Sequence, residues 1–264
     1  MSIQFQPQAA PSIVDKQAQP GHGPAGDGAA QPPAVRVEHV TRSYSVGEQH
    51  VRALNGIDLA VPSGTFVVLM GRSGSGKTTL LNMIGGLDKP TTGEVYINGR
   101  PLSNLSDSQL TELRRKEFGF VFQSFALLPI LSAAENVELP LRIAGGLSAR
   151  ERRERVQEAL ALVGLSRWAD HRPYEMSGGQ QQRVAIARAL VSRPRVIIGD
   201  EPTGDLDSKT TETILRLLRS IVDASGVTLV MSTHDPSAEE FADAVYRLQD
   251  GQVVDQSMRR PVAV

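Results

Sequence analysis

The segment Gly71–Thr79 combines glycines, a lysine and threonines in a spacing that suits phosphate binding. It follows an apolar run, Phe66–Met70, and leads into a helix-like run, Leu80–Ile84. Glycines let successive backbone N–H groups turn toward one anion, and a following helix adds its dipole. Lys77 offers a positive charge to the β- and γ-phosphates, and the Thr78 hydroxyl can bind Mg²⁺. The pattern predicts a phosphate-binding loop made of Gly71, Arg72, Ser73, Gly74, Ser75, Gly76, Lys77, Thr78 and Thr79.

Two adjacent acids, Asp200 and Glu201, follow a second apolar run, Val196–Ile198. A phosphate-binding loop needs such a distant carboxylate, because the loop alone leaves the coordination of Mg²⁺ incomplete. Adjacent residues leave the end of a strand in different directions, so the two carboxylates can have separate roles. We assign Asp200 to the metal, through a water molecule, and Glu201 to polarising the attacking water.

A second loop of small residues precedes another helix-like segment, and on physical grounds it could hold an anion without a lysine. With this loop, the sequence resembles the ATP-binding cassette (ABC) ATPases over residues 35 to 254. Met176 stands where that family more often has leucine, and this exchange conserves volume. The residues that match the family's signature motif are Ser177, Gly178, Gly179 and Gln180.

The resemblance assigns roles to four further residues, which by themselves would more often be structural. It implies that Tyr44 stacks on adenine and that Gln123 reaches the metal and the attacking water. It also implies that His234 contacts the γ-phosphate and that Asp207 lies in the loop that meets an opposite copy. Asp205, in the same loop, departs from the small or amide residue expected there.

The resemblance also implies a fold and a way of working. The fold would be α/β, a P-loop NTPase of the ABC-ATPase type with a RecA-like core, an antiparallel β subdomain and a helical subdomain at about residues 105–185. The expected ligands are ATP and Mg²⁺, and the expected reaction is ATP hydrolysis. Each ATP would lie between the phosphate-binding loop of one copy and the signature loop of another, so we expect a homodimer that closes on ATP.

The composition excludes several other classes of protein. The chain of 264 residues has 28 Lys and Arg, 29 Asp and Glu, and no cysteine. Disulfide frameworks, thiol catalysis and cysteine zinc sites are therefore excluded, and no basic excess points to a nucleic-acid partner. No apolar run approaches the ~20 residues of a membrane span, and no secretory signal is evident. We expect a cytoplasmic protein, held at the inner face of the cell membrane through a permease.

The local pattern predicts where ordered structure begins and ends. Residues 1–33 contain six Gln, six Pro, six Ala and four Gly, and we expect them to be disordered, with a partner-binding arm as the alternative. One domain should span residues 34–255, with a flexible tail at 256–264. The dipeptides Asn98-Gly99 and Asp250-Gly251 predict antiparallel hairpins.

The apolar runs at residues 66–70, 196–198 and 227–231 predict parallel strands that are buried on both faces. The segment that begins at Ser148 has the pattern of a capping box, with Glu151, followed by a helix. Its interleaved arginines and glutamates predict a solvated helix face rather than a nucleic-acid patch.

Two segments, Gly86–Gly93 and Phe125–Leu141, resemble bacterial ATPases that serve lipoprotein-release, macrolide-export and antimicrobial-peptide permeases. This implies an integral-membrane permease as partner, with Phe125, Leu127 and Leu128 lining the groove for its coupling helix; ordinary core packing is the alternative. The nearest other function is a cell-division type regulator, which drives a permease-like partner without moving a solute. ABC ATPases that act on DNA or ribosomes fit less well, because the chain shows neither their long insertions nor a second cassette.

Overall fold

The computed structural model describes residues 32–47 and 49–258. The tail expected at residues 1–33 falls almost entirely outside this range, as do residues 259–264 of the expected C-terminal tail.

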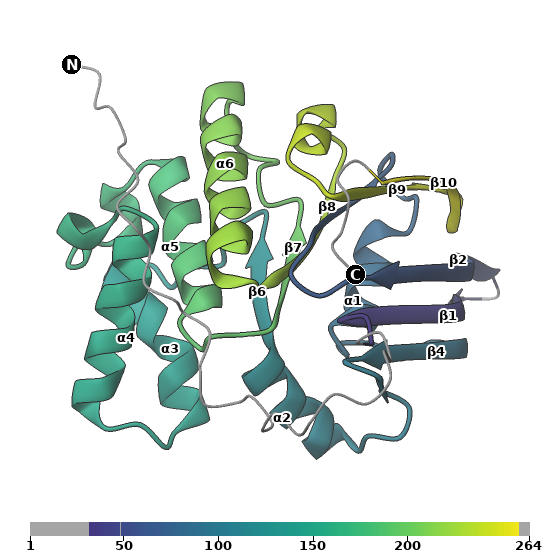
Figure 1. Cartoon of the computed structure of the whole chain (residues 1–264), viewed down its shortest axis with the longest axis horizontal. Coiled ribbons are helices and arrows are strands. Elements are labelled where there is room, and N and C mark those ends of the chain that lie inside the picture. The colour runs from purple at the N-terminus through teal and green to yellow at the C-terminus, as the bar shows by residue number, and fades with distance from the viewer. Residues whose placement is uncertain (1–31, 48, 259–264) are drawn as a thin grey trace, which may run out of the picture.

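The centre of the molecule is a six-stranded sheet with the order β10-β9-β3-β8-β7-β6 (Figure 1). All neighbours in it are parallel except β9 and β10, which form an antiparallel pair. The parallel centre confirms the α/β class. Its strands are β3 (Phe66–Met70), β6 (Phe118–Phe122), β7 (Val196–Asp200), β8 (Thr228–Thr233), β9 (Ala244–Gln249) and β10 (Gln252–Met258).

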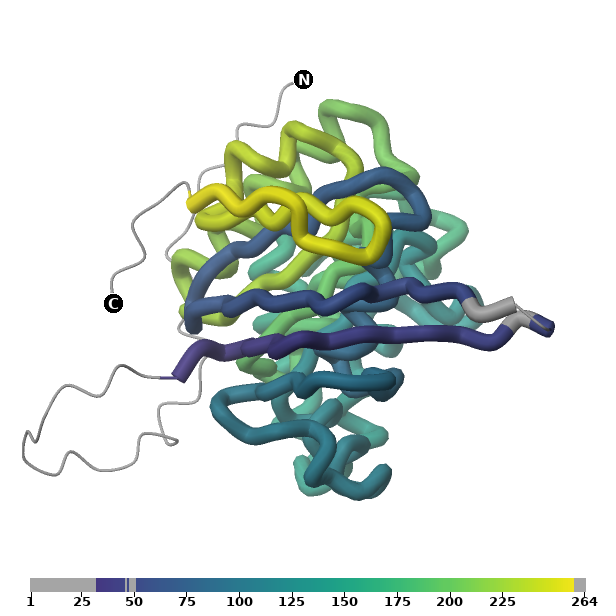
Figure 2. The backbone as a smooth tube through the Cα atoms, turned by 90° about the vertical axis from the view of Figure 1, so that its right-hand side faces the viewer, coloured from purple at the N-terminus to yellow at the C-terminus, as the bar shows by residue number. Residues whose placement is uncertain are grey.

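A second sheet is antiparallel and has four strands in the order β2-β1-β4-β5. Figure 2 shows β1 and β2 as two long neighbouring strands that reach beyond the body of the molecule on one side. This sheet corresponds to the antiparallel β subdomain that the resemblance implies. Its strands are β1 (Val35–Val46), β2 (Gln49–Val61), β4 (Thr92–Ile97) and β5 (Arg100–Pro101).

The apolar strands of the central sheet separate two hydrophobic cores. Along β3, Phe66, Val68 and Met70 face one core, which also contains residues of the helical layer. Val67 and Leu69 face the other core, between the central sheet and the antiparallel sheet. Because successive side chains of a strand point to opposite faces, a strand buried on both faces tends to form a nearly continuous apolar run. This confirms the three predicted buried strands.

Helices cover the central sheet, and three of them, α3, α4 and α5, pack together beside it on the left of Figure 1. The strand β6 lies inside the range 105–185 that we expected to be helical, and it pairs in parallel with β7. Its alternating aromatic residues favour a strand. The helices are α1 (Lys77–Ile84), α2 (Asp107–Glu117), α3 (Ala133–Ala144), α4 (Ala149–Leu162), α5 (Gly178–Leu190) and α6 (Ser208–Ser225).

Helix α5 packs unusually close to β6 at Gly119. A β-carbon at this position would lie 2.4 Å from the backbone oxygen of Ala189, so only glycine fits. This contact attaches the helical layer to the edge of the central sheet.

Both predicted hairpins are present. Asn98 and Gly99 have φ angles of 49° and 76° between β4 and β5, and Asp250 and Gly251 have 49° and 73° between β9 and β10. Strand β10 continues to Met258, which pairs with Ala244. The strand therefore passes residue 255, where we expected the domain to end, because β9 offers it partners along its whole length.

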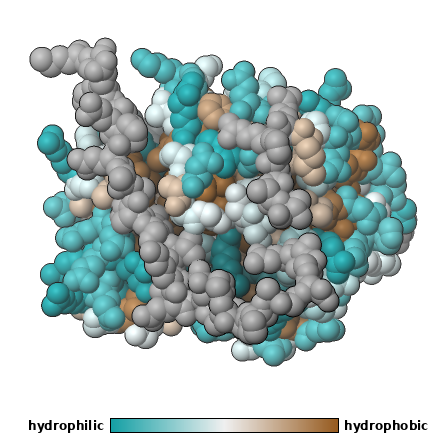
Figure 3. Space-filling model, in the orientation of Figure 1, coloured by the Kyte–Doolittle hydropathy of each residue, from teal (hydrophilic) through white to brown (hydrophobic). Residues whose placement is uncertain are grey.

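The outer surface over α4 is hydrophilic, as Figure 3 shows on the left of the molecule. Ser148 and Glu151 form the predicted capping box, and Arg150 pairs with Glu154 at 2.9 Å. This agrees with a solvated helix face. Within residues 32–47 and 49–258, no helix has the length and apolarity that crossing a membrane would require.

Asn136, on α3, holds the loop that precedes this helix. Its side chain is fully buried, and its Oδ1 accepts a hydrogen bond from the Leu128 N–H at 2.8 Å. Its Nδ2 donates to the backbone oxygens of Leu128, Leu131 and Ser132 at 3.0–3.1 Å. One amide thus bonds to four backbone groups of this loop.

We expect Asn136→Ala to lower the free energy of unfolding by about 3 kcal/mol, because it removes four hydrogen bonds and takes from the Leu128 N–H and the Leu131 oxygen the partner that the side chain supplies. Urea unfolding followed by circular dichroism measures the change. Gln157→Ala on the exposed face of α4 is the matched control and should leave the unfolding midpoint unchanged. An equal midpoint for both variants would contradict the anchoring role of Asn136.

Candidate active site

The predicted phosphate-binding loop connects the end of β3 to the start of α1. Gly76 precedes α1 with a φ of 101°, and a β-carbon there would lie 2.7 Å from the Ala53 backbone oxygen. Helix α1 has no side-chain cap and no acidic residue in its first turn, whereas α2 to α6 are each capped by a serine or aspartate. The N–H groups at the start of α1 therefore remain available to an anion.

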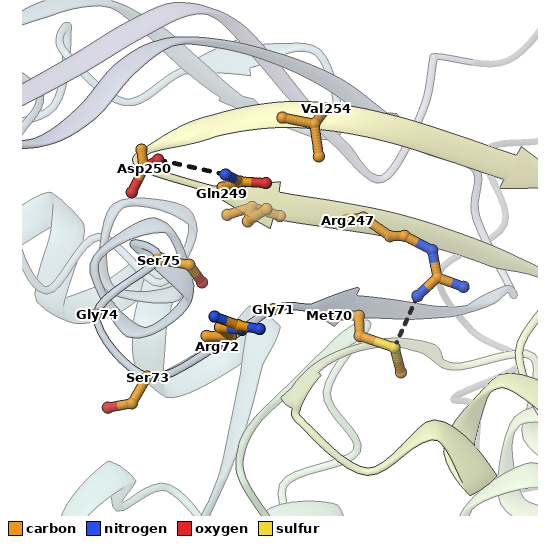
Figure 4. A pocket seen from close by; sticks show the side chains of 11 residues that line it. Met70, Gly71, Arg72, Ser73, Gly74, Ser75, Arg247, Gln249, Asp250 and Val254 are labelled. Carbon is orange, nitrogen blue, oxygen red and sulfur yellow. Dashed lines mark hydrogen bonds between the residues drawn. The ribbon is translucent and has the colours of Figure 1, made fainter.

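The outer side of this loop borders a cavity of about 550 Å³ beneath the β9–β10 hairpin (Figure 4). The hairpin is bonded to the loop, because the Gly251 N–H donates to the Ser75 oxygen at 3.1 Å. Gly71 approaches the neighbouring strand so closely that a β-carbon would lie 2.3 Å from the Leu248 oxygen. These contacts hold the loop in a defined shape.

Lys77 is almost completely buried, with 6% of its side chain exposed. Its Nζ donates to the backbone oxygens of Gly71 at 2.7 Å and Arg72 at 3.1 Å. The nearest carboxylate oxygen, Glu201 Oε1, lies 3.5 Å away. The lysine charge is therefore held inside the curve of its own loop.

Asp200 lies at the end of β7, and its carboxylate accepts hydrogen bonds from two hydroxyl groups. Thr78 Oγ1, from α1, and Ser232 Oγ, from β8, donate to Asp200 Oδ1 at 3.1 and 2.6 Å. Asp200 and Ser232 are register partners in the parallel pair β7–β8. The structure thus brings together the hydroxyl and the carboxylate that we assigned to the metal.

Glu201 lies between Lys77 and His234. Its φ is 48°, a left-handed conformation that is strained for a residue with a side chain. Its N–H donates to the Oγ and backbone oxygen of Ser232 at 3.0 and 3.2 Å, which hold it in this conformation. Its Oε2 lies 3.0 Å from His234 Nδ1. The exposed imidazole of His234 and the buried ammonium of Lys77 therefore flank one carboxylate.

Gln123 follows β6 directly, and its side chain bonds to a residue that we did not assign to the site. Its Nε2 donates to Asp205 Oδ1 at 2.8 Å. The strand register places Phe122 beside Asp200, so Gln123 leaves the sheet next to the two acids.

Tyr44 is held by two residues, and the sequence pattern pointed to neither. Its hydroxyl donates to Asp88 Oδ2 at 2.9 Å, and the Arg42 guanidinium lies 4.5 Å from the centre of its ring. Arg42 also makes two hydrogen bonds to Asp88, at 2.8 and 3.0 Å. The ring orientation is thus set by an ion pair between β1 and the loop after α1.

Asp207 caps α6. Its Oδ1 accepts from the N–H groups of Lys209 and Thr210 at 3.1 Å, and its Oδ2 accepts from Thr210 Oγ1 at 2.6 Å. Hydrogen bonding from Thr210 keeps the pKa of the Asp207 carboxyl below its ordinary value.

The signature loop caps α5 through a reciprocal pair, in which the Ser177 Oγ accepts from the Gln180 N–H and the Gln180 side chain accepts from the Ser177 N–H. It packs on the loop that contains Asp207: a β-carbon at Gly178 would lie 3.4 Å from Leu206 Cδ2. No hydrogen bond between described residues joins Ser177–Gln180 to the phosphate-binding loop.

Sequence reasoning missed Ser232 as a site residue, although it directly follows the predicted strand at residues 227–231 and lies two residues before His234. The one signal that could have found it is the prediction that both strands are parallel, because parallel neighbours end at the same edge of a sheet and would place Ser232 near Asp200. Arg42 lies two residues before Tyr44 on the same strand, but its bonds to Asp88, the bond from Tyr44 to Asp88 and the contact of Asp205 had no local signal, because these partners lie far apart in the sequence.

The geometry agrees with comparisons to known proteins. The protein family described as "ABC transporter" matches residues 54–204. An uncharacterized ABC transporter ATP-binding protein of Methanocaldococcus jannaschii, MJ0796, is 50% identical over 222 residues, which are 83% of this chain and 94% of that protein. The macrolide export ATP-binding/permease protein MacB of Syntrophobacter fumaroxidans is 46% identical over 224 residues, which are 84% of this chain but only 31% of MacB.

Among solved structures, the dimeric post-hydrolysis state of the MJ0796 cassette bound to ADP and Pi has a TM-score of 0.79 and 48% identity. The match covers 86% of this chain and 100% of that one. With the phosphate-binding loop, the paired acids and the signature loop all in place, the chain belongs to the ABC transporter family and is one of its ATP-binding, ATP-hydrolysing cassettes.

Proposed function

We propose that Lys77, Thr78, Asp200, Glu201 and His234 form the hydrolytic centre of this cassette. The observation that carries the proposal is their convergence where β3, β7 and β8 end. The carboxylate of Glu201 lies 3.5 Å from Lys77 and 3.0 Å from His234, while Asp200 bonds to Thr78. This arrangement gathers a cation for phosphate, two oxygen donors for a metal, and a base beside a histidine.

The residues at Asp200 suit Mg²⁺. The Thr78 hydroxyl and the Asp200 carboxylate are hard oxygen donors 3.1 Å apart, and Mg²⁺ prefers one or two such protein oxygens together with water and phosphate. When bound, Mg²⁺ would neutralise negative charge on the phosphate oxygens. Asp200 would hold it through water, and Thr78 would hold it directly. Gln123 would supply a further oxygen from the end of β6.

Lys77 and Glu201 would exchange partners when ATP binds. The β- and γ-phosphates carry more negative charge than the carbonyls of Gly71 and Arg72, so they would take over the Lys77 ammonium. Glu201 would then be free to polarise a water molecule, and His234 would hold its carboxylate and contact the γ-phosphate. The strained backbone of Glu201, fixed by Ser232, would keep this base in place.

A second copy of the chain would complete the ATP site. The signature loop of this copy makes no hydrogen bond to its own phosphate-binding loop among the described residues. In the family arrangement it would face the phosphates bound by the other copy, with Asp207 at the contact and Tyr44 on the adenine. The dimeric MJ0796 cassette structures support this arrangement.

The partner would be an integral-membrane permease of the macrolide-export or lipoprotein-release type, placing the cassette at the inner face of the membrane. Relatives named for macrolide export are described as ATP-binding and permease proteins in one chain. The present chain spans about a third of their length. The MJ0796 protein, 94% of which is covered by the match, supports a permease on a separate chain. Leu128, 46% exposed, would lie in the docking groove, whereas Leu127 is partly buried against the core.

The first test is Glu201→Gln. Because the amide cannot act as a base, we expect the turnover of ATP to fall at least about 100-fold, while an ATP-bound dimer persists. Phosphate release measures the rate, and size-exclusion chromatography with ATP measures the dimer. Glu240→Gln, on the exposed surface, is the same exchange outside the site and should be silent. Turnover of Glu201→Gln at the parental rate would refute the assignment.

The second test is Ser232→Ala. This hydroxyl touches both Asp200 and the Glu201 backbone, so its loss should lower kcat by about 10- to 100-fold and change ATP affinity little. Steady-state kinetics and equilibrium binding of ATP separate the two effects. Ser220→Ala, which removes a hydroxyl from the surface of α6, is the control. A Ser232→Ala enzyme with parental kcat would show that the positioning of the acids does not depend on this residue.

The third test concerns the permease. Leu128→Asp should abolish copurification of a membrane protein with the tagged chain in mild detergent, because a charge would be buried in an apolar contact. The ATPase rate of the isolated variant should stay at the parental value, since Leu128 lies outside the hydrolytic centre. Undiminished recovery of the membrane partner would exclude Leu128 from the docking surface.

A further inference from the structure

Gln123 and Asp205 are joined by a hydrogen bond between two loops that are distant in the sequence. Gln123 Nε2 donates to Asp205 Oδ1 at 2.8 Å across 82 residues. The glutamine side chain also lies against the backbone of Gly204, where a β-carbon would be 3.0 Å from its Cδ and Nε2. Gly204 thus leaves room for the amide, and Asp205 binds one end of it.

The chemistry of this bond determines which way the amide faces. A carboxylate accepts hydrogen bonds but cannot donate one, so the Gln123 nitrogen must be the atom that faces Asp205. The amide oxygen is attached to the same carbon as that nitrogen, so it points away from Asp205. Only this oxygen can bind a metal ion. A small apolar residue at position 205 would leave both orientations of the amide accessible.

Gln123 and Asp205 lie in two different loops next to the paired acids. Gln123 leaves β6 beside Asp200, because Phe122 and Asp200 are register partners. Asp205 lies in the loop between the paired acids and α6, in a turn where the Gly204 N–H donates to the Glu201 oxygen at 3.0 Å. This loop also contacts the signature loop, through Leu206. The loop that contains Asp205 therefore contacts both the signature loop, through Leu206, and Gln123, the proposed metal ligand.

We propose that Asp205 is a positioning residue that orients the Gln123 amide, so that its oxygen is presented to the Mg²⁺ of bound ATP. The inference rests on the proposed role of Gln123 at the metal. It assigns a function to a carboxylate that departs from the residue type expected at this position. In metal sites, groups that orient a ligand in this way affect metal affinity although they do not touch the metal.

The test is the Mg²⁺ dependence of ATP hydrolysis in a double-mutant cycle. Asp205→Ala should raise the Mg²⁺ concentration for half-maximal activity by about 10-fold, because the amide loses its fixed orientation. Asp205→Asn should stay near the parental value, since its carbonyl can still accept the bond. Binding of ATP without Mg²⁺ should be the same in all variants. Asp205 is exposed, so these variants should fold, and thermal unfolding checks this.

The Gln123→Ala background separates the bond from the charge of Asp205 and from the proposed function itself. In that background, Asp205→Ala should have no further effect on the Mg²⁺ dependence. An equal shift in both backgrounds would assign the effect to the charge and overturn the inference, as would a shift toward lower Mg²⁺. If Gln123→Ala raises the Mg²⁺ requirement but Asp205→Ala does not, the inference fails while the role of Gln123 stands. If Gln123→Ala has no effect, that role fails as well.

Discussion

The parallel pairing of β3, β8 and β7 is the constraint on which the proposed hydrolytic centre depends. Parallel strands end at the same edge of a sheet, and here that edge carries the phosphate-binding loop, the paired acids and the strand end before His234. The register places Asp200 beside Ser232. The buried Ser232 hydroxyl can therefore donate to the Asp200 carboxylate and accept from the Glu201 backbone N–H. Since alternate residues of β3 pack into different cores, a shift in register by one residue would move each side chain into the wrong core. The geometry of the site is thus stabilised by the burial of the strands.

At this edge of the sheet, the positive charge of Lys77 is offset by the oxygens around it. Lys77 is buried, and an unpaired buried ammonium would be costly, so the carbonyls of its own loop and Glu201 surround it. Glu201 in turn contacts His234, at 3.0 Å. Under the proposed function, a phosphate that binds Lys77 would therefore change the partners of Glu201 as well. In the proposed mechanism, Lys77 would thus couple the binding of ATP to the activation of Glu201.

Much of the site could be predicted from the sequence because its chemistry is local. Residues 71–79 are contiguous, and an anion bound by successive N–H groups needs glycines and a lysine at fixed spacing. The hairpins at Asn98-Gly99 and Asp250-Gly251 were predicted for the same reason, since positive φ restricts the residue types. The helical region was predicted less well, because the range 105–185 came from the family resemblance alone, whereas the aromatic residues of β6 favour a strand, which pairs with β7.

The sequence by itself determined the family, the phosphate-binding loop and the identity of the acids, because each depends on neighbours along the chain. The tertiary structure alone decided which distant residues serve them: Ser232 for the acids, Asp88 for Tyr44 and Asp205 for Gln123. The physical reason is that a hydrogen bond requires atoms about 3 Å apart. Side chains separated by 32, 44 and 82 residues reach that distance only after the sheets have formed and packed.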